Sequence, residues 1–169
     1  MDTTPAPPAS LAIRLSRPED GPALAELDRR SWSPVSDVGP RREAGAPFFD
    51  EGHRPEDYLV AEEAGEPVGW IRVVPPTPLA SNAHVRAIHG LVVVQRARRA
   101  GIGRRLVEAA CAHARGQGAR RITLHVLAHN LAARRLYESC GFAVEGVQPE
   151  EFLLDGRYVD DVLMGRRLL

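Results

Sequence analysis

The sequence predicts an α/β fold, in which a mixed, mostly antiparallel sheet of about seven strands is flanked by about four helices. Three observations indicate this fold. Short apolar or alternating segments typical of strands recur along the chain, and amphipathic segments with a helical period lie between some of them. A strand, a helix and a strand follow one another between residues 85 and 127, which implies a right-handed parallel crossover. Two hairpins elsewhere in the chain add antiparallel pairs.

The N-terminal half begins with a proline-rich segment, residues 1–10, which we expect to be a disordered tail. A single domain is expected to occupy residues 11–169, because a chain of 169 residues with 44% hydrophobic residues can build one real core. Residues 11–15 alternate as a strand, and the next segment carries leucines at helical spacing. Residues 31–53 are interrupted by proline and glycine and are expected to form a loop-rich cap with room for a short helix.

The middle of the chain reads as a hairpin followed by the parallel crossover. Residues 58–62 and 68–74 are expected to pair as antiparallel strands. A central strand is expected over residues 85–94 and a helix over residues 101–115. In the next strand the aliphatic side chains alternate with polar ones, so His125 is expected on the opposite face from its aliphatic neighbours.

The last third of the chain is expected to form a helix and a hairpin. Asn130 is a suitable N-cap and Gly141 a suitable terminator for the helix between them. Residues 142–147 and 158–164 are predicted as strands. The Asp155-Gly156 pair predicts a type I′ turn between them.

Composition excludes several classes of protein. Arginine plus lysine total 22 against 22 acidic residues, so no global field recruits nucleic acid or a membrane surface. We find no apolar targeting segment or membrane span, and expect a cytoplasmic protein. Cys111 and Cys140 lack the spacing of metal ligands, so we expect buried reduced thiols and no metal site.

The turn after the central strand predicts a phosphate site. Gly101 and Gly103 let the backbone approach a ligand closely, where the free N–H groups of a starting helix favour an anion. Arg98, Arg99 and Arg104 add forked donors suited to phosphate oxygens. Two glycines at such a junction often serve only the turn, and a solvated basic turn is the alternative interpretation. The arginines favour the phosphate site.

Two stretches resemble one family. Residues 98–103, Arg-Arg-Ala-Gly-Ile-Gly, are similar to the [Gln/Arg]-x-x-Gly-x-[Gly/Ala] signature of the GNAT acyltransferase superfamily, which holds acetyl-coenzyme A (acetyl-CoA). Residues 125–142 resemble the second half of the family's core, which has a strand, an Asn, a helix bearing Tyr, and Gly-Phe. The stretches occur in family order within roughly the last half of the chain. The resemblance implies the acyl-CoA N-acyltransferase fold.

The resemblance also implies a set of residues that bind the cofactor. In the family the central strand and the strand bearing His125 diverge, and the exposed backbone bonds the pantetheine arm. One of these N–H groups polarises the thioester carbonyl. Asn130 and Tyr137 are seven residues apart, so both can face one groove. The implied cofactor-binding residues are Leu91, Val92, Val93, Arg98, Arg99, Ala100, Gly101, Ile102, Gly103, Arg104 and Asn130.

Two residues are candidates for catalysis. Tyr137 occupies the family's usual position for the acid that protonates the departing thiolate, although a tyrosine there could simply fill the core face of its helix. His125 precedes Asn130 by five residues, where relatives often carry a Glu base, and it is our candidate for the base. His89 and ordered water are the alternatives. The acidic residues of the last hairpin, including Asp160 and Asp161, are expected to be solvated turn charges, and contact of some of them with a cationic amine is the alternative.

The implied function is transfer of an acetyl group from acetyl-CoA to a primary amine in a ternary complex, without a covalent enzyme intermediate. The acceptor is a small molecule or a peptide. The alternative is a non-catalytic acyl-CoA sensor of the same fold. A nucleic-acid binder is a weaker alternative, because no aromatic residue interleaves the arginines. A two-fold homodimer is the default expectation for assembly.

Overall fold

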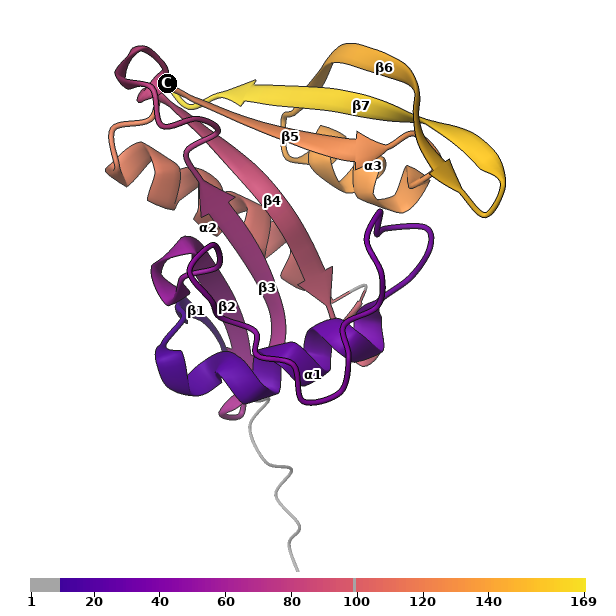
Figure 1. Cartoon of the computed structure of the whole chain (residues 1–169). Coiled ribbons are helices and arrows are strands. Elements are labelled where there is room, and N and C mark those ends of the chain that lie inside the picture. The colour runs from indigo at the N-terminus through magenta and orange to yellow at the C-terminus, as the bar shows by residue number, and fades with distance from the viewer. Residues whose placement is uncertain (1–9, 99) are drawn as a thin grey trace, which may run out of the picture.

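A computed structural model describes residues 10–98 and 100–169. The tail expected at residues 1–10 lies outside the described residues, except for Ser10. The predicted mixed sheet is confirmed: within the described residues its seven strands lie in the order β1-β2-β3-β4-β5-β7-β6, and only the β4–β5 pair is parallel (Figure 1). The strands are β1 (Leu11–Leu15), β2 (Tyr58–Glu63), β3 (Glu66–Val74), β4 (Val85–Val93), β5 (Arg121–Leu127), β6 (Ala143–Leu154) and β7 (Arg157–Arg167).

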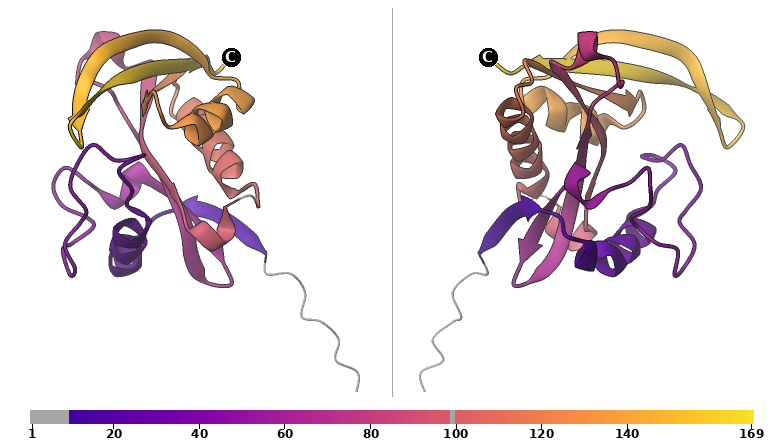
Figure 2. Two further views of the ribbon diagram at one scale, coloured as in Figure 1. Left: turned by 90° about the vertical axis from the view of Figure 1, so that its right-hand side faces the viewer. Right: turned by 60° about the vertical axis from the view of Figure 1, so that its left-hand side comes forward.

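Helices cover both faces of this sheet. In Figure 2 α2 and α3 lie on one face, and α1 lies on the other. The described residues contain three α-helices, one fewer than the sequence suggested, because residues 32–54 form turns and a loop without an α-helix. The α-helices are α1 (Gly21–Ser31), α2 (Ile102–Gly116) and α3 (Leu131–Ser139). Short 3-10 turns occupy Pro18–Asp20, Pro55–Asp57, Ala80–Asn82 and Gln95–Ala97.

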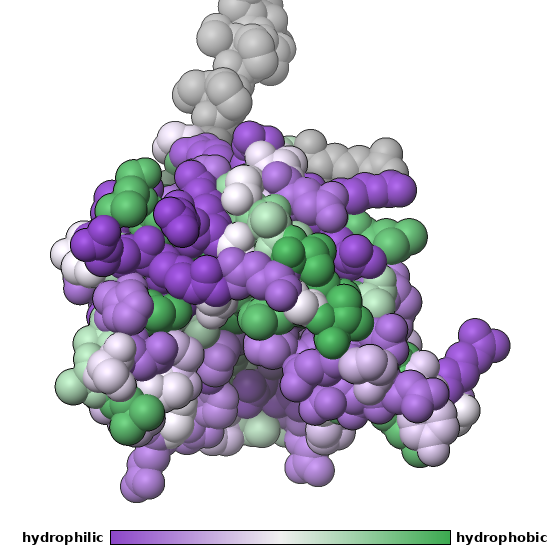
Figure 3. All heavy atoms as spheres, turned by 90° about the horizontal axis from the view of Figure 1, so that it is seen from above, coloured by the Kyte–Doolittle hydropathy of each residue, from purple (hydrophilic) through white to green (hydrophobic). Residues whose placement is uncertain are grey.

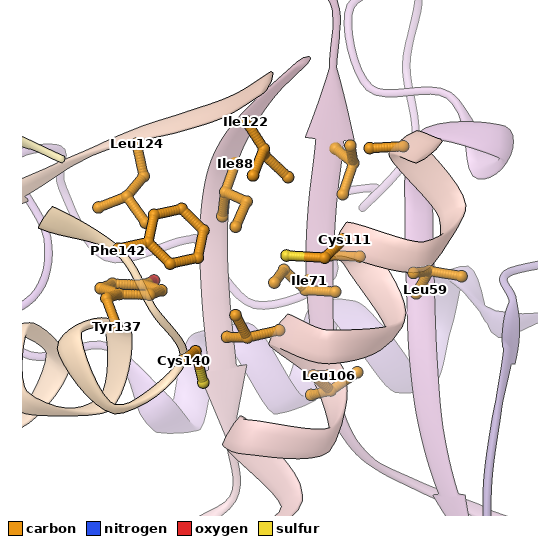
Figure 4. Packing of buried hydrophobic residues seen from close by; sticks show 14 of the residues in the cluster. Leu59, Ile71, Ile88, Leu106, Cys111, Ile122, Leu124, Tyr137, Cys140 and Phe142 are labelled. Carbon is orange, nitrogen blue, oxygen red and sulfur yellow. The ribbon is translucent and has the colours of Figure 1, made fainter. Parts of the chain in front are cut away.

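Two hydrophobic clusters hold the layers together. The larger one fills the space between the sheet and helices α2 and α3, and its members include Leu106 of α2 and the strand residues Ile71 and Ile122 (Figure 4). These side chains are fully buried, and each stabilises the fold by about 1.5–3 kcal/mol. The smaller cluster joins α1 to the opposite face. There Phe48 brings the loop of residues 32–54 onto Tyr58, with ring centroids 5.0 Å apart.

Predicted turn and cap residues have the conformations that the sequence indicated. The Asn130 side chain accepts a hydrogen bond from the Ala133 N–H (3.2 Å) at the start of α3. Gly141 follows α3 with a φ of +83°. Asp155 and Gly156 both have positive φ, as a type I′ turn requires. The hairpin strands β6 and β7 are longer than predicted, because their pairing continues up to this turn.

The parallel ladder between β4 and β5 is short. It runs from the pair Val85–Arg121 to the pair Ile88–Leu124, and beyond that both strands continue without pairing to each other. Figure 1 shows β4 and β5 diverging from a common start. An irregularity in the β3–β4 ladder lies where β4 diverges: one extra residue is inserted around Gly90, whose φ is +121°. The divergence opens the sheet along one edge of β4.

The surface of the described residues is mixed in character. On the face shown in Figure 3 hydrophilic residues predominate, and hydrophobic residues lie in small separate groups. None of the described helices has the length and hydropathy needed to span a bilayer. Cys111 and Cys140 are buried free thiols, as expected.

Candidate active site

A cavity of about 330 Å³ lies where β4 and β5 diverge. Its walls come from segments far apart in the sequence: both diverging strands, α3, β6, β7 and the loop of residues 32–54. Residues of both faces of the sheet contribute, so the cavity lies in the gap between the strands. The polar lining residues are Ser36, His89, His125, Asn130, Tyr137 and Asp161.

The predicted phosphate turn lies at the start of α2, just beyond the end of β4. Gly101 is the N-cap residue of α2 and has left-handed φ and ψ of 75° and 10°. A Cβ atom on Gly101 would have no heavy atom within 4 Å, so the space above this residue is open. A Cβ atom on Gly103 would lie 3.1 Å from Leu136 Cδ2. Gly103 therefore allows α2 and α3 to pack closely, whereas Gly101 leaves room for a ligand.

The arginines of this turn differ in what they contact. The Nε of Arg98 donates to the Val93 carbonyl (3.0 Å), which ties its exposed side chain to the end of β4. Arg104 donates to the Ser139 carbonyl (3.1 Å) and so joins α2 to the end of α3. Arg99 lies outside the described residues. Of the two predicted arginines that the structure describes, Arg98 is held at the end of β4 beside the turn, whereas Arg104 contacts the end of α3.

The remaining predicted turn residues contribute mainly through their backbone. Ala100 is exposed, and its N–H donates to the Ala97 carbonyl (3.4 Å). The Ile102 side chain is 2% exposed and belongs to the larger core cluster. The first N–H groups of a helix have no acceptor within that helix. The start of α2 thus offers free backbone N–H donors, and the buried Ile102 side chain anchors this end of the helix in the core.

Leu91, Val92 and Val93 form the end of β4 that the resemblance assigned to cofactor binding. On one side they pair with β3, from Leu91–Ile71 to Val93–Gly69. On the other side the ladder with β5 has already ended. Backbone groups on that side are not paired to β5 and are open to an added extended chain, as at any sheet edge, except that the Val93 carbonyl already accepts from Arg98 Nε.

His125 and Asp161 form a hydrogen-bonded pair in the cavity. The His125 Nδ1 lies 2.6 Å from the Asp161 Oδ2. The His125 side chain is 55% exposed and lies on the opposite face from Ile122, Leu124 and Val126, as predicted, whereas the Asp161 side chain is 8% exposed. The expectation that Asp161 is a solvated hairpin charge was wrong. Its strand, β7, lies next to β5 and buries the carboxylate against the imidazole.

His89 lies on the same cavity wall, at the irregular part of β4. Partial burial, together with the positive charge of Arg72 and the proximity of His125, lowers the pKa of His89 below its usual 6.5. His89 is therefore neutral at pH 7. The structure brings both candidate histidines to one cavity.

Tyr137 enters the cavity from α3. Its ring packs on Phe142, with centroids 5.7 Å apart, and lies near Leu124 (Figure 4). Burial raises the pKa of the Tyr137 phenol above its usual 10, with a smaller effect from Cys140. The phenol therefore keeps its proton at neutral pH. The ring fills the core, and the same residue lines the cavity, so the two interpretations of Tyr137 are compatible.

Some lining residues were not found from the sequence. Asp161 is 36 residues from His125 in the chain, and no spacing pattern links the two. Ser36 and Val38 come from the loop of residues 32–54, whose turn is held near α3 by a contact between His129 Nε2 and the Val35 carbonyl (3.1 Å). Asp161 reaches the cavity through the pairing of β5 with β7, and Ser36 and Val38 reach it through the loop contact. Neither contact is visible in the local sequence.

Comparison with known proteins agrees with this fold. The Acetyltransferase (GNAT) family profile matches residues 21–142. The uncharacterized N-acetyltransferase YhfO of Bacillus subtilis is 39% identical over 137 residues, which cover 77% of this chain and 88% of the relative. The chain belongs to the GNAT acetyltransferase family.

Solved structures show the same fold. The structure of smu.2055 from Streptococcus mutans has a TM-score of 0.82 and 26% identity, and the match covers 95% of this chain and 99% of that one. A GNAT superfamily phosphinothricin acetyltransferase from Sinorhizobium meliloti, solved in complex with acetyl-CoA, has a TM-score of 0.77 at 18% identity, covering 93% of this chain and 88% of that one. At that identity the second likeness shows the fold alone.

Proposed function

We propose that the protein transfers an acetyl group from acetyl-CoA to a primary amine by direct attack in a ternary complex. The observation that carries this proposal is the cavity between the diverging strands β4 and β5, which has an imidazole and a phenol in its walls. His125 lies on the face of β5 away from the larger core, and Tyr137 comes from α3 on the other face. Acetyl-CoA and the amine thus approach the gap from opposite faces.

The start of α2 binds the diphosphate of acetyl-CoA. The positive end of the helix dipole and the first backbone N–H groups attract an anion. Gly101 leaves that space open, and Arg98 adds a guanidinium beside it. Arg99 and Arg104, the other arginines implied by the resemblance, add positive charge that attracts the diphosphate.

The pantetheine arm lies along the free edge of β4 at Leu91, Val92 and Val93. Backbone groups that β5 leaves unpaired form hydrogen bonds with the amides of the arm. An N–H group of the same edge donates to the thioester carbonyl oxygen and stabilises the oxyanion that forms on attack. Asn130 lines the cavity and caps α3, the helix that carries Tyr137.

The transfer makes one C–N bond and breaks one C–S bond. The neutral amine attacks the thioester carbon, and Nε2 of His125 takes the proton that the amine nitrogen loses. As the intermediate collapses, the thiolate of coenzyme A leaves and takes a proton from the Tyr137 hydroxyl. The raised pKa of Tyr137 keeps that proton in place until it is needed. Neutral His89 and an ordered water are the alternative routes for the amine proton.

The experiment that tests this function measures thiol release from acetyl-CoA over a panel of amines. The panel contains small primary amines, amino acids, polyamines and peptides with free N-termini, each with a tertiary-amine analogue as control. We expect release that depends on at least one primary amine and gives the N-acetyl product by mass spectrometry. Binding of acetyl-CoA without turnover on any amine would instead support the non-catalytic sensor.

A further inference from the structure

We propose that Asp161 is a positioning residue that holds His125 in the Nδ1–H tautomer and directs Nε2 into the cavity. This inference rests on the proposed function, because it assigns a partner to the base of that reaction. Asp161 lies on β7, outside the two stretches, residues 98–103 and 125–142, that carry the family resemblance.

The backbone register places the two side chains together. In the β5–β7 ladder His125 pairs with Leu163, and Leu127 pairs with Asp161. Paired residues of an antiparallel ladder lie on the same face, and so do residues two apart on one strand. Asp161 is therefore the diagonal neighbour of His125 on the same face of the sheet.

Burial makes the contact specific. The Asp161 side chain is 8% exposed, and His125 is the only side chain to which its carboxylate is hydrogen-bonded within residues 10–98 and 100–169. A buried carboxylate is costly unless it is paired. The contact of 2.6 Å with Nδ1 satisfies it and holds the His125 ring at that nitrogen, while the His125 side chain as a whole is 55% exposed.

The chemistry of the pair fixes the tautomer. An ionised carboxylate only accepts hydrogen bonds, so the Nδ1 atom that it contacts must carry the proton. A neutral imidazole then has its lone pair on Nε2, at the opposite side of the ring. When Nε2 takes a proton from the attacking amine, the adjacent carboxylate stabilises the imidazolium that forms. Asp161 acts through His125 and does not contact the substrate.

Two measurements test the proposal. The first is ¹⁵N-histidine NMR of the whole protein, which distinguishes the two neutral tautomers by their nitrogen shifts, with His125→Gln used to assign the signal. We expect the Nδ1–H form in the unsubstituted protein. In Asp161→Asn the new side-chain amide donates to Nδ1, so we expect the Nε2–H form. An Nε2–H form in the unsubstituted protein would overturn the proposal, whether or not the variant folds.

The second measurement is steady-state kinetics with an amine that the panel identifies. We expect kcat of Asp161→Asn to fall by about 10²-fold or more, with the KM for acetyl-CoA unchanged. In a His125→Gln background the same substitution should cause no further loss. The control is Asp160→Asn, whose carboxylate instead accepts from the Glu150 N–H (2.8 Å) and should leave kcat unaffected. Full activity in Asp161→Asn, or additive losses in the double variant, would refute the proposal.

The two measurements separate this inference from the proposed function. If the protein turns over no amine but shows the Nδ1–H tautomer, the proposed enzymatic function is contradicted and the His125–Asp161 arrangement stands. If the protein turns over an amine but His125 is in the Nε2–H tautomer, the proposed function stands and the positioning role of Asp161 is contradicted.

Discussion

Ile88 and Leu124 form the last pair of the parallel ladder between β4 and β5, and both residues line the cavity that opens at this point. Both side chains are buried in the larger core cluster, so the point of divergence is fixed by packing. Beyond it, β4 stays paired to β3 and β5 stays paired to β7. The gap therefore has rigid walls, which suits a site that must hold two substrates in a fixed geometry.

Removing the hydroxyl of Tyr137 tests the proposed acid. We expect Tyr137→Phe to lower kcat by about 10²-fold or more, because the thiolate then leaves without a proton donor. Affinity for acetyl-CoA, measured by calorimetry, should not change, and the ring should still pack on Phe142. Tyr58→Phe is the matched control, since Tyr58 lies in the cluster on the α1 side of the sheet. Equal kcat in the two variants would contradict the role of Tyr137.

Filling the open space at Gly101 tests the phosphate site. We expect Gly101→Val to weaken acetyl-CoA binding at least tenfold, because its side chain enters the space assigned to the diphosphate. The positive φ adds about 1–2 kcal/mol of backbone strain, so unfolding must be measured in parallel. Gly118→Val is the control: Gly118 also has a positive φ and open surroundings, but it follows the other end of α2. Unchanged calorimetric affinity in Gly101→Val would rule out this site.

The irregularity in β4 depends on Gly90. A Cβ atom there would lie 2.8 Å from the Trp70 ring, and the φ of +121° is one that other residues rarely adopt. We expect Gly90→Ala to lower the free energy of unfolding in urea by about 2 kcal/mol or more. Gly146→Ala, in β6, meets no neighbouring atom and should change stability little. A Gly90→Ala variant as stable as this control would show that the glycine is not required.

Buried thiol and phenol groups predict a loss of stability at high pH. Burial raises the pKa of Cys111 from 9.0 to about 11. The folded state thus holds this proton more tightly than the unfolded state does. The contribution of the Cys111 thiol to the free energy of unfolding is therefore fully present below pH 9 and is lost as the pH rises toward 11. Between pH 8 and pH 10 we expect the free energy of unfolding to fall by about 1.4 kcal/mol from this group alone. Cys111→Ala should reduce that fall in urea titrations; an undiminished pH dependence would contradict the assignment.

Much of the fold was predictable because local signals and tertiary structure agree. The alternation of Ile122, Leu124 and Val126 fixed one face of β5, and the Asp155-Gly156 pair fixed the turn of the last hairpin. Asn130 caps α3 as its residue type indicated. In each case the physical cause lies within a few residues of the chain.

The parts that were missed depend on contacts between distant residues. The partnership of His125 with Asp161 follows from the pairing of β5 with β7, which no local pattern specifies. The extra residue at Gly90 follows from the register of β4 against β3. The cap was predicted as loop-rich, but only the structure shows that Ser36 and Val38 reach the cavity.

The most direct test of the central claim is a crystal structure of the protein with acetyl-CoA bound. The proposed function predicts density for the diphosphate at the start of α2, above Gly101, and for the thioester between the end of β4 and the Tyr137 hydroxyl. The pantetheine arm should run along Leu91 to Val93, in the place that β5 leaves free. A cofactor bound elsewhere on the molecule, with the gap between β4 and β5 empty, would contradict the proposed function.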